Sequence, residues 1–144
     1  MTKVRRLVWE HAPGSVAALG AAEPRVLRTS RTAEVGRTIA ERRSRYNFFP
    51  ADIFSDPAWD ILLELYASEL TQIRITISKL CAAVPVPVTT AMRWISTLER
   101  EELICRRKDP NDGRRVFVAL SAKGIVSMDA YFESSANEWN SRSS

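Results

Sequence analysis

The 144-residue sequence has few of the residues that catalytic and metal sites need: it contains one histidine and two cysteines. His11 lies in a segment broken by proline and glycine, so no triad or two-histidine metal site can be assembled around it. Cys81 and Cys105 lack a C-x-x-C spacing, which argues against a zinc site and fits a reducing compartment. We expect both to be small core residues and expect no enzyme activity, no metal and no cofactor.

Long hydrophobic runs are also missing. The sequence has no stretch of about 18 apolar residues, so no membrane span is expected. Arg5 and Arg6 precede only a few apolar residues, which makes a poor signal peptide. We expect a cytoplasmic protein.

Charge is plentiful and unevenly distributed. Hydrophobic residues make up 45% and charged residues 26%, as in an ordinary globular domain. The net charge is +4, with +6 on residues 1–46, −4 on residues 47–75 and +2 on residues 106–144. A basic chain favours an anionic partner, although surface lysines and arginines alone can produce this excess. We expect a loosely ordered basic arm at residues 1–29, followed by one domain at residues 30–144.

A β-hairpin with a basic tip is predicted between residues 103 and 120. Leu103–Arg107 and Val116–Leu120 have strand composition, and Pro110, Asn111 and the Asp112-Gly113 pair between them favour a chain reversal, with the positive φ that glycine tolerates. The tip carries five cations and two carboxylates. A protruding loop of this charge suits a polyanion groove, although a solvated loop has the same composition.

Two helices are predicted directly before this hairpin. Thr76 is a suitable N-cap for the first, which ends where Val84–Pro87 interrupts it. The second runs from Pro87 to about Glu101 and has two different faces. Its expected core stripe is Val88, Ala91, Met92, Ile95 and Leu98, and its expected outer face is Thr90, Arg93, Thr97 and Arg100.

The outer face of that second helix has the chemistry of a DNA contact. Arginine can pair with guanine edges, and threonine can meet a phosphate, a base edge or a thymine methyl group. Glu99 is the only acidic residue on that side. Trp94 also lies toward this face, where it can brace a sugar–phosphate strand or pack on a neighbouring helix; we expect packing.

Further helices flank this region. Residues 29–46 are helical in character and arginine-rich, and can form a dimer helix or lie along the domain with solvated arginines. Asp56-Pro57 starts a core helix with Trp59, Leu62, Leu63, Tyr66 and Leu70 at helical spacing, and residues 73–75 look like a short strand. Ser121 is a good N-cap for a closing helix whose Ile125, Met128 and Phe132 serve core or dimer packing, and residues 137–144 look frayed.

The motif Asp109-Pro-Asn-Asp-Gly-Arg-Arg-Val-Phe-Val-Ala-Leu-Ser-Ala-Lys-Gly124 resembles the wing and following helix start of MarR-type transcriptional regulators. Residues 90–104 resemble the recognition helix of that family. Pro85 and Glu102 depart from its pattern, since glycine is common at both places. The resemblance covers residues 56–131 and implies an α+β, mainly α fold: a winged helix-turn-helix with a two- to three-stranded antiparallel sheet and flanking N- and C-terminal helices.

By this resemblance, Arg114 enters a minor groove with Asp112 bracing its guanidinium, and the second helix enters the major groove. The residues expected to contact double-stranded DNA are Thr76, Thr89, Thr90, Arg93, Thr97, Arg106, Lys108, Asp112, Arg114 and Arg115. The family also implies a homodimer and a small-molecule effector, but no residue set identifies an effector pocket. The alternative is a winged helix that binds another protein instead of DNA.

Overall fold

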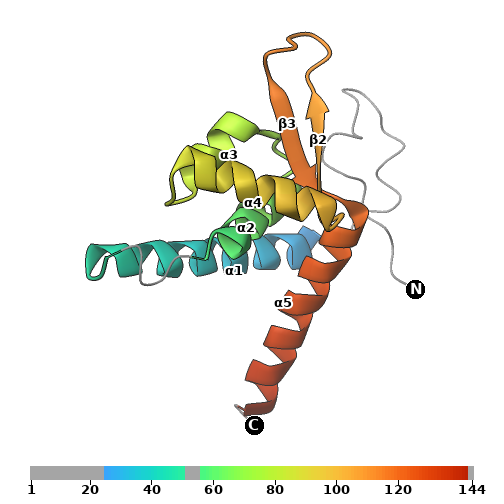
Figure 1. Ribbon diagram of the computed structural model, residues 1–144. Helices are drawn as coiled ribbons and strands as arrows, with labels where there is room; N and C mark the ends of the chain where they lie inside the picture. The colour runs from blue at the N-terminus through green and yellow to red at the C-terminus, as the bar shows by residue number, and fades with distance from the viewer. Residues whose placement is uncertain (1–24, 51–55, 143–144) are drawn as a thin grey trace.

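The computed structural model describes residues 25–50 and 56–142 (Figure 1). Its elements are helix α1 (Arg25–Ser44), 3-10 helix η2 (Arg45–Asn47), α2 (Pro57–Thr71), β1 (Ile75–Thr76), α3 (Ile77–Ala83), α4 (Val88–Arg100), β2 (Ile104–Lys108), β3 (Val116–Leu120) and α5 (Ala122–Arg142). Residues 1–24 of the expected arm lie outside the described residues, and residues 25–29 belong to α1, which begins earlier than expected. No helix in these ranges is long and apolar enough to cross a membrane.

A three-stranded antiparallel sheet in the order β1-β3-β2 forms the wing, as predicted. In β3, Val118 is opposite both Ile75 and Arg106. The first strand begins at Ile75 instead of residue 73, because Ile73 closes the end of α2: its N–H donates to the Ser68 carbonyl and its carbonyl accepts from the Ser68 hydroxyl. These bonds leave Ile73 65% exposed and out of the sheet.

Helix α2 is the centre of the hydrophobic core. Asp56 caps it by accepting a 3.4 Å hydrogen bond from the Trp59 N–H, and Pro57 occupies its first position, as predicted. Its burial extends beyond the predicted stripe, since Ile61 and Leu65 are fully buried while Trp59 is only partly buried. A helix enclosed on most sides shows no single apolar stripe, which explains this difference.

The two cysteines differ in burial. Cys81 belongs to the core, as predicted. Cys105 is only half-buried, because it lies in β2 on the side of the strand turned away from the core residue Ile104.

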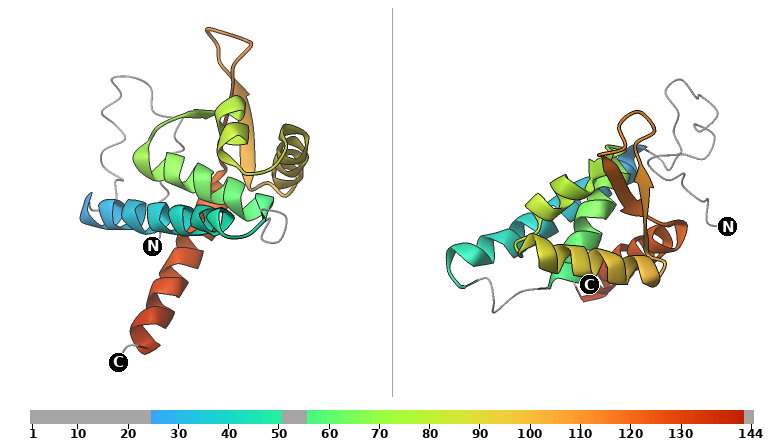
Figure 2. Two further views of the ribbon diagram at one scale, coloured as in Figure 1. Left: turned by 90° about the vertical axis from the view of Figure 1, so that its left-hand side faces the viewer. Right: turned by 45° about the horizontal axis from the view of Figure 1, so that its top comes forward.

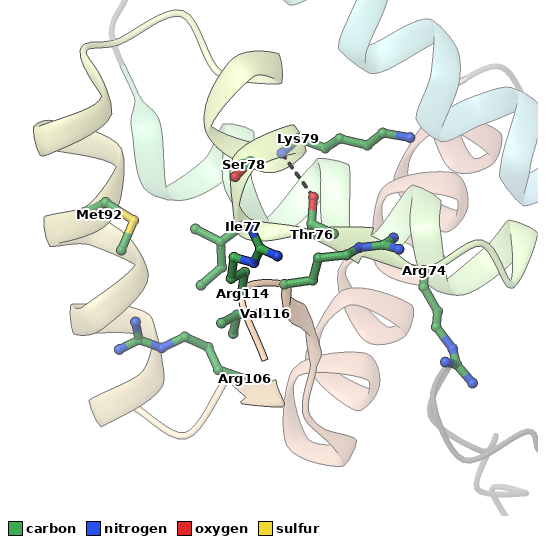
Figure 3. Close-up of a pocket in the computed structure, with 10 residues that line it drawn as sticks. Arg74, Thr76, Ile77, Ser78, Lys79, Met92, Arg106, Arg114 and Val116 are labelled. Atoms are coloured by element: carbon green, nitrogen blue, oxygen red, sulfur yellow. Dashed lines mark hydrogen bonds between the residues drawn. The ribbon is translucent and has the colours of Figure 1, made fainter. Parts of the chain in front are cut away.

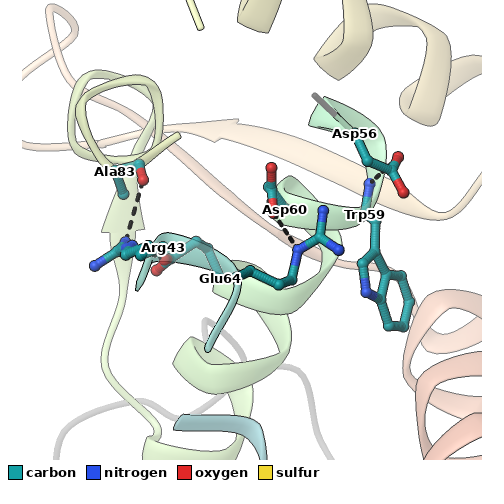
Figure 4. Close-up of polar contacts among 7 residues, drawn as sticks. Arg43, Asp56, Trp59, Asp60, Glu64 and Ala83 are labelled. Atoms are coloured by element: carbon teal, nitrogen blue, oxygen red, sulfur yellow. Dashed lines mark hydrogen bonds and ion pairs between the residues drawn. The ribbon is translucent and has the colours of Figure 1, made fainter. Parts of the chain in front are cut away.

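Ion pairs fasten α1 to α2 (Figure 4). Arg42 Nε lies 2.6 Å from Asp60 Oδ1, and Arg43 Nη2 lies 2.5 Å from Glu64 Oε1. Arg43 also donates to the carbonyl of Ala83 at the end of α3. These two arginines of α1 therefore bind carboxylates of their own domain.

Helix α5 is longer than predicted and projects away from the side that carries the wing (Figures 1 and 2). Ser121 caps it by accepting from the Gly124 N–H at 3.0 Å, as predicted. The expected fraying from residue 137 is wrong, since the helix continues to Arg142. Tyr66 of α2 donates a 2.5 Å hydrogen bond to Asp129 and stacks on Phe132, which anchors the first half of α5.

Candidate nucleic-acid interface

The outer face of α4 is cationic and short-polar, as predicted. Arg93 and Arg100 are exposed, and Thr89 is exposed in the first turn. Thr90 and Thr97 are half-buried, and the Thr97 hydroxyl donates to the Arg93 carbonyl and accepts from Arg100 Nη2 at 3.2 Å. Arg93 is therefore the freest long cation of this helix.

Two apolar side chains on α4, Val88 and Trp94, are exposed, and Val88 is more exposed than predicted. Val88 was expected in the core stripe but is 61% exposed, because the first turn of α4 extends beyond the elements that cover Ala91, Ile95 and Leu98. Trp94, which was expected toward the outer face, is 37% exposed, so most of its side chain is covered. The surface of α4 thus presents apolar groups beside arginine and threonine.

The loop of the wing is shaped by its two aspartates. Asp109 Oδ1 accepts from the Asn111 N–H at 2.8 Å, and Asp112 Oδ1 accepts from the Arg114 N–H at 3.1 Å. These are Asx turns, in which a side chain satisfies the backbone two residues on. Gly113 does not adopt a positive φ, so the expectation that it supplies one is wrong: the aspartate side chains make the reversal instead.

Arg114 projects freely from this loop. Its side chain is 96% exposed, and its Nε lies 3.8 Å from Asp112 Oδ1. The resemblance implies that Asp112 braces this guanidinium, and the two charged groups lie at ion-pair distance. Because the pair is exposed, we expect it to orient the guanidinium and to add little to stability.

The Arg106 guanidinium is hydrogen-bonded to a carboxylate, whereas that of Arg114 lies 3.8 Å from one. Arg106 Nε and Nη2 donate to the two carboxylate oxygens of Glu99, each at 2.9 Å. The hydrogen bond from Arg106 holds the pKa of the Glu99 carboxyl below its usual value, and the same bond raises the pKa of Arg106. Sequence analysis singled out both residues but missed the pair, since it depends on where the chain turns back after α4.

A second arginine arrangement surrounds Phe117, near the loop end of the wing. The guanidinium carbons of Arg74 and Arg115 lie 5.5 and 5.4 Å from the ring centroid of Phe117, within cation–π range. Arg115 also lies 3.9 Å from Asp109. Arg74 was not among the predicted contacts, because sequence analysis placed it only as a member of a strand.

These cations line one groove between α3, α4 and the wing (Figure 3). Its volume is about 620 Å³, and its lining includes Arg74, Thr76, Ser78, Lys79, Met92, Arg106, Arg114 and Arg115. The Thr76 hydroxyl accepts from the Lys79 N–H at 3.3 Å and so caps α3, as predicted. The groove joins four predicted residues, Thr76, Arg106, Arg114 and Arg115, with Arg74 and Lys79, which sequence analysis missed.

The remaining predicted contacts are not among the described residues that line this groove. Lys108 is exposed at the end of β2, and the predicted residues of α4 follow the helix that contributes Met92 to the lining. Within the described ranges, no three histidine, cysteine or acidic side chains lie close enough to hold a metal ion. The surface is suited to bind an extended anion.

Comparison with known proteins agrees with this architecture. Residues 54–116 match the model of the MarR family. The fold is similar to that of S. aureus MepR in a complex with DNA, with a TM-score of 0.55 and 20% identity over 82% of this chain and 89% of that chain. It is also similar to S. aureus MepR in its DNA-binding conformation, with a TM-score of 0.50 and 23% identity over 76% of this chain and 82% of that one.

No curated protein matches the sequence. At these identities the solved structures show a shared fold, and the family match rests on the sequence of the segment from the start of α2 to the wing. The resemblance of the wing and recognition helix to MarR-type regulators is confirmed. Residues 54–116 therefore match the MarR family model, and the fold of the chain is a winged helix-turn-helix.

Proposed function

We propose that this protein is a sequence-specific, double-stranded DNA-binding regulator of transcription. The observation that carries the proposal is the groove in which the wing arginines, the start of α3 and helix α4 meet. Among the described residues, its lining includes the cations Arg74, Lys79, Arg114 and Arg115, together with Arg106, whose guanidinium is bonded to Glu99. Such a surface fits the phosphates of a duplex. The MepR–DNA complex, which has the same fold, supports this assignment.

In this proposal α4 enters the major groove. Thr89, Thr90, Arg93 and Thr97 lie on its outer side, where arginine reads guanine and threonine meets phosphate or a thymine methyl group. Arg114 enters the adjacent minor groove, and its guanidinium is oriented by Asp112. Phosphates are bound by Thr76, Lys108 and Arg115, to which we add Arg74 and Lys79 because they share the groove.

We further propose that the protein acts as a homodimer joined through its terminal helices. Helix α5 leaves Val126, Tyr131 and Trp139 exposed by 55%, 51% and 72%, which is a large apolar area for a solvated helix. A mass of twice 16.2 kDa in solution, reduced to that of one chain by Trp139→Asp, is the expected result. A two-fold dimer would bind half-sites about 10 base pairs apart, one turn of DNA.

The experiment that tests DNA binding is a titration against random duplex DNA at several salt concentrations. Neutralisation of phosphates makes the affinity fall steeply with salt, by about 0.9 logarithmic units per tenfold change in salt for each phosphate. Selection of bound sequences from a random pool then gives the operator. Absence of salt-dependent affinity for any duplex would contradict the proposal and favour a winged helix that binds protein.

A further inference from the structure

Glu99 and Arg106 form a bidentate ion pair. Two parallel hydrogen bonds of 2.9 Å join the guanidinium to both carboxylate oxygens. This fork-to-fork arrangement fixes direction as well as distance, which a single ammonium cannot do. It joins the last turn of α4 to the third residue of β2.

The turn beneath this pair is fixed by backbone hydrogen bonds. The Leu103 N–H donates to the Leu98 carbonyl and the Glu102 N–H to the Glu99 carbonyl, both at 3.0 Å, which is the Schellman pattern of a helix C-terminus. Glu102 has a φ of 61°, the left-handed conformation that this pattern needs. The turn therefore sets where β2 begins relative to α4.

The start of α5 holds the same turn from another side. The Ser121 hydroxyl donates to the Glu102 carbonyl, and Lys123 Nζ donates to the Glu101 carbonyl at 3.2 Å. The Ser121 N–H donates to the Leu103 carbonyl at 2.9 Å. With the turn fixed here, the pair of Glu99 and Arg106 adds a side-chain contact between α4 and the middle of β2.

The pair also decides what Arg106 can bind. Arg106 lines the basic groove, yet two of its donor nitrogens already have a carboxylate acceptor. The side chains of Arg106 and Glu99 are 30% and 38% exposed, so a phosphate can reach the guanidinium only in competition with Glu99. A pair this exposed adds little to folding stability, so we expect its effect in DNA binding.

We propose that Glu99 is a positioning residue that determines the sequence specificity of the DNA-binding site. Its carboxylate keeps Arg106 away from phosphates and fixes the spacing between α4 and the wing, so that Arg93 and Arg114 meet their two grooves together. A cation that binds phosphates raises the affinity for DNA of any sequence. A fixed distance between α4 and the wing raises the affinity only for DNA whose bases match both contacts. This inference rests on the proposed function.

The test compares Glu99→Gln with wild-type protein on the selected operator and on random duplex, over a range of salt. The variant releases Arg106, so we expect tighter binding to random duplex and a salt slope steeper by about 0.9, the value of one added phosphate contact. We expect the ratio of operator to random affinity to fall about tenfold, on the scale of one mismatched base pair.

Glu101→Gln is the matched control, since it makes the same charge change at an exposed position two residues away. We expect it to leave the salt slope and the affinity ratio near their wild-type values. Arg106→Lys keeps the charge but cannot form the double hydrogen bond, so it should lower the ratio as Glu99→Gln does. Circular dichroism of each variant should report an intact fold.

Two results would overturn the inference while leaving DNA binding intact. One is an unchanged affinity ratio in Glu99→Gln. The other is a salt slope that becomes shallower by about 0.9 in Arg106→Gln, which would place Arg106 on a phosphate of the wild-type complex. If wild-type protein shows no salt-dependent affinity for DNA, the proposed function itself fails, and the inference fails with it.

Discussion

The Arg114 side chain, in the loop of the wing, is 96% exposed to solvent. We expect Arg114→Ala to weaken operator binding by about 1–3 kcal/mol, because a base-directed or narrow-groove contact is lost. The loss should be smaller on random duplex. Fluorescence titrations of both duplexes measure it, with Arg37→Ala as the control, since Arg37 is an exposed arginine on α1. Equal affinity of Arg114→Ala and wild type for the operator would refute the minor-groove role.

Glu102 occupies a position that glycine would fill more comfortably. Its φ of 61° costs a residue with a Cβ about 1 kcal/mol, so Glu102→Gly should stabilise the fold by about that amount. Urea unfolding measures the change. Glu101→Gly, at a φ of −77°, serves as the control and should not be stabilising. A destabilised Glu102→Gly would show that the Glu102 side chain has a stabilising role that outweighs its backbone.

The outward threonines and arginines of α4 could be predicted from residue spacing, and Val88 could not. Helical periodicity assigns Val88 to the same stripe as Ala91 and Ile95, but burial of a first turn depends on whether another element reaches it. The same limit applies to Glu99 and Arg106, which are brought together by the turn between them. Their charges are visible in the sequence, but their distance is a tertiary property.

At the scale of elements, α5 is packed against the turn after α4 through Gly124. A Cβ at Gly124 would overlap the carbonyl oxygen of Leu103, which belongs to backbone and cannot move aside easily. We expect Gly124→Ala to destabilise the protein by on the order of 1–3 kcal/mol. Thermal unfolding compares it with Gly36→Ala on α1, where the new Cβ meets nothing within 4 Å and should stabilise the helix by up to about 1 kcal/mol. Equal stability of the two variants would argue against the close approach at Gly124.

The order of elements from α2 to the start of α5 could be predicted because its signals are local. Asp56 and Thr76 cap their helices, the prolines after Val84 separate α3 from α4, and Ser121 starts α5. The end of α5 could not be predicted, since residues 137–142 are largely polar and exposed and carry no burial signal. The ion pairs between α1 and α2 could not be predicted either, because they join residues far apart in the sequence. The α1 arginines were expected to be solvated or to lie in a dimer helix.

At the scale of the whole molecule, Tyr66 joins three helices. Its hydroxyl donates to Asp129 of α5 and accepts from Arg31 of α1 at 3.2 Å. Burial, together with the bond to Asp129, raises the pKa of Tyr66 to about 12 from its model-compound value of 10.0. The unfolded chain loses this proton near pH 10, whereas the folded protein retains it.

Stability from Tyr66 is therefore fully present below pH 10 and is lost as pH rises toward 12. The loss is on the order of 2 kcal/mol. Urea unfolding at several pH values from 8 to 12 should show the decline, and Tyr66→Phe should flatten part of it. If the wild-type and Tyr66→Phe curves run parallel over this range, Tyr66 is not the group responsible.

Ser121 alone separates β3 from α5, and it is hydrogen-bonded to the turn after α4. The hairpin and α5 are therefore joined directly, without a flexible linker between them. In the proposed homodimer, the orientation of each α5 would therefore set the position of the hairpin loop of the same chain. The crossing angle of two α5 helices would then determine how far apart the two tips can reach.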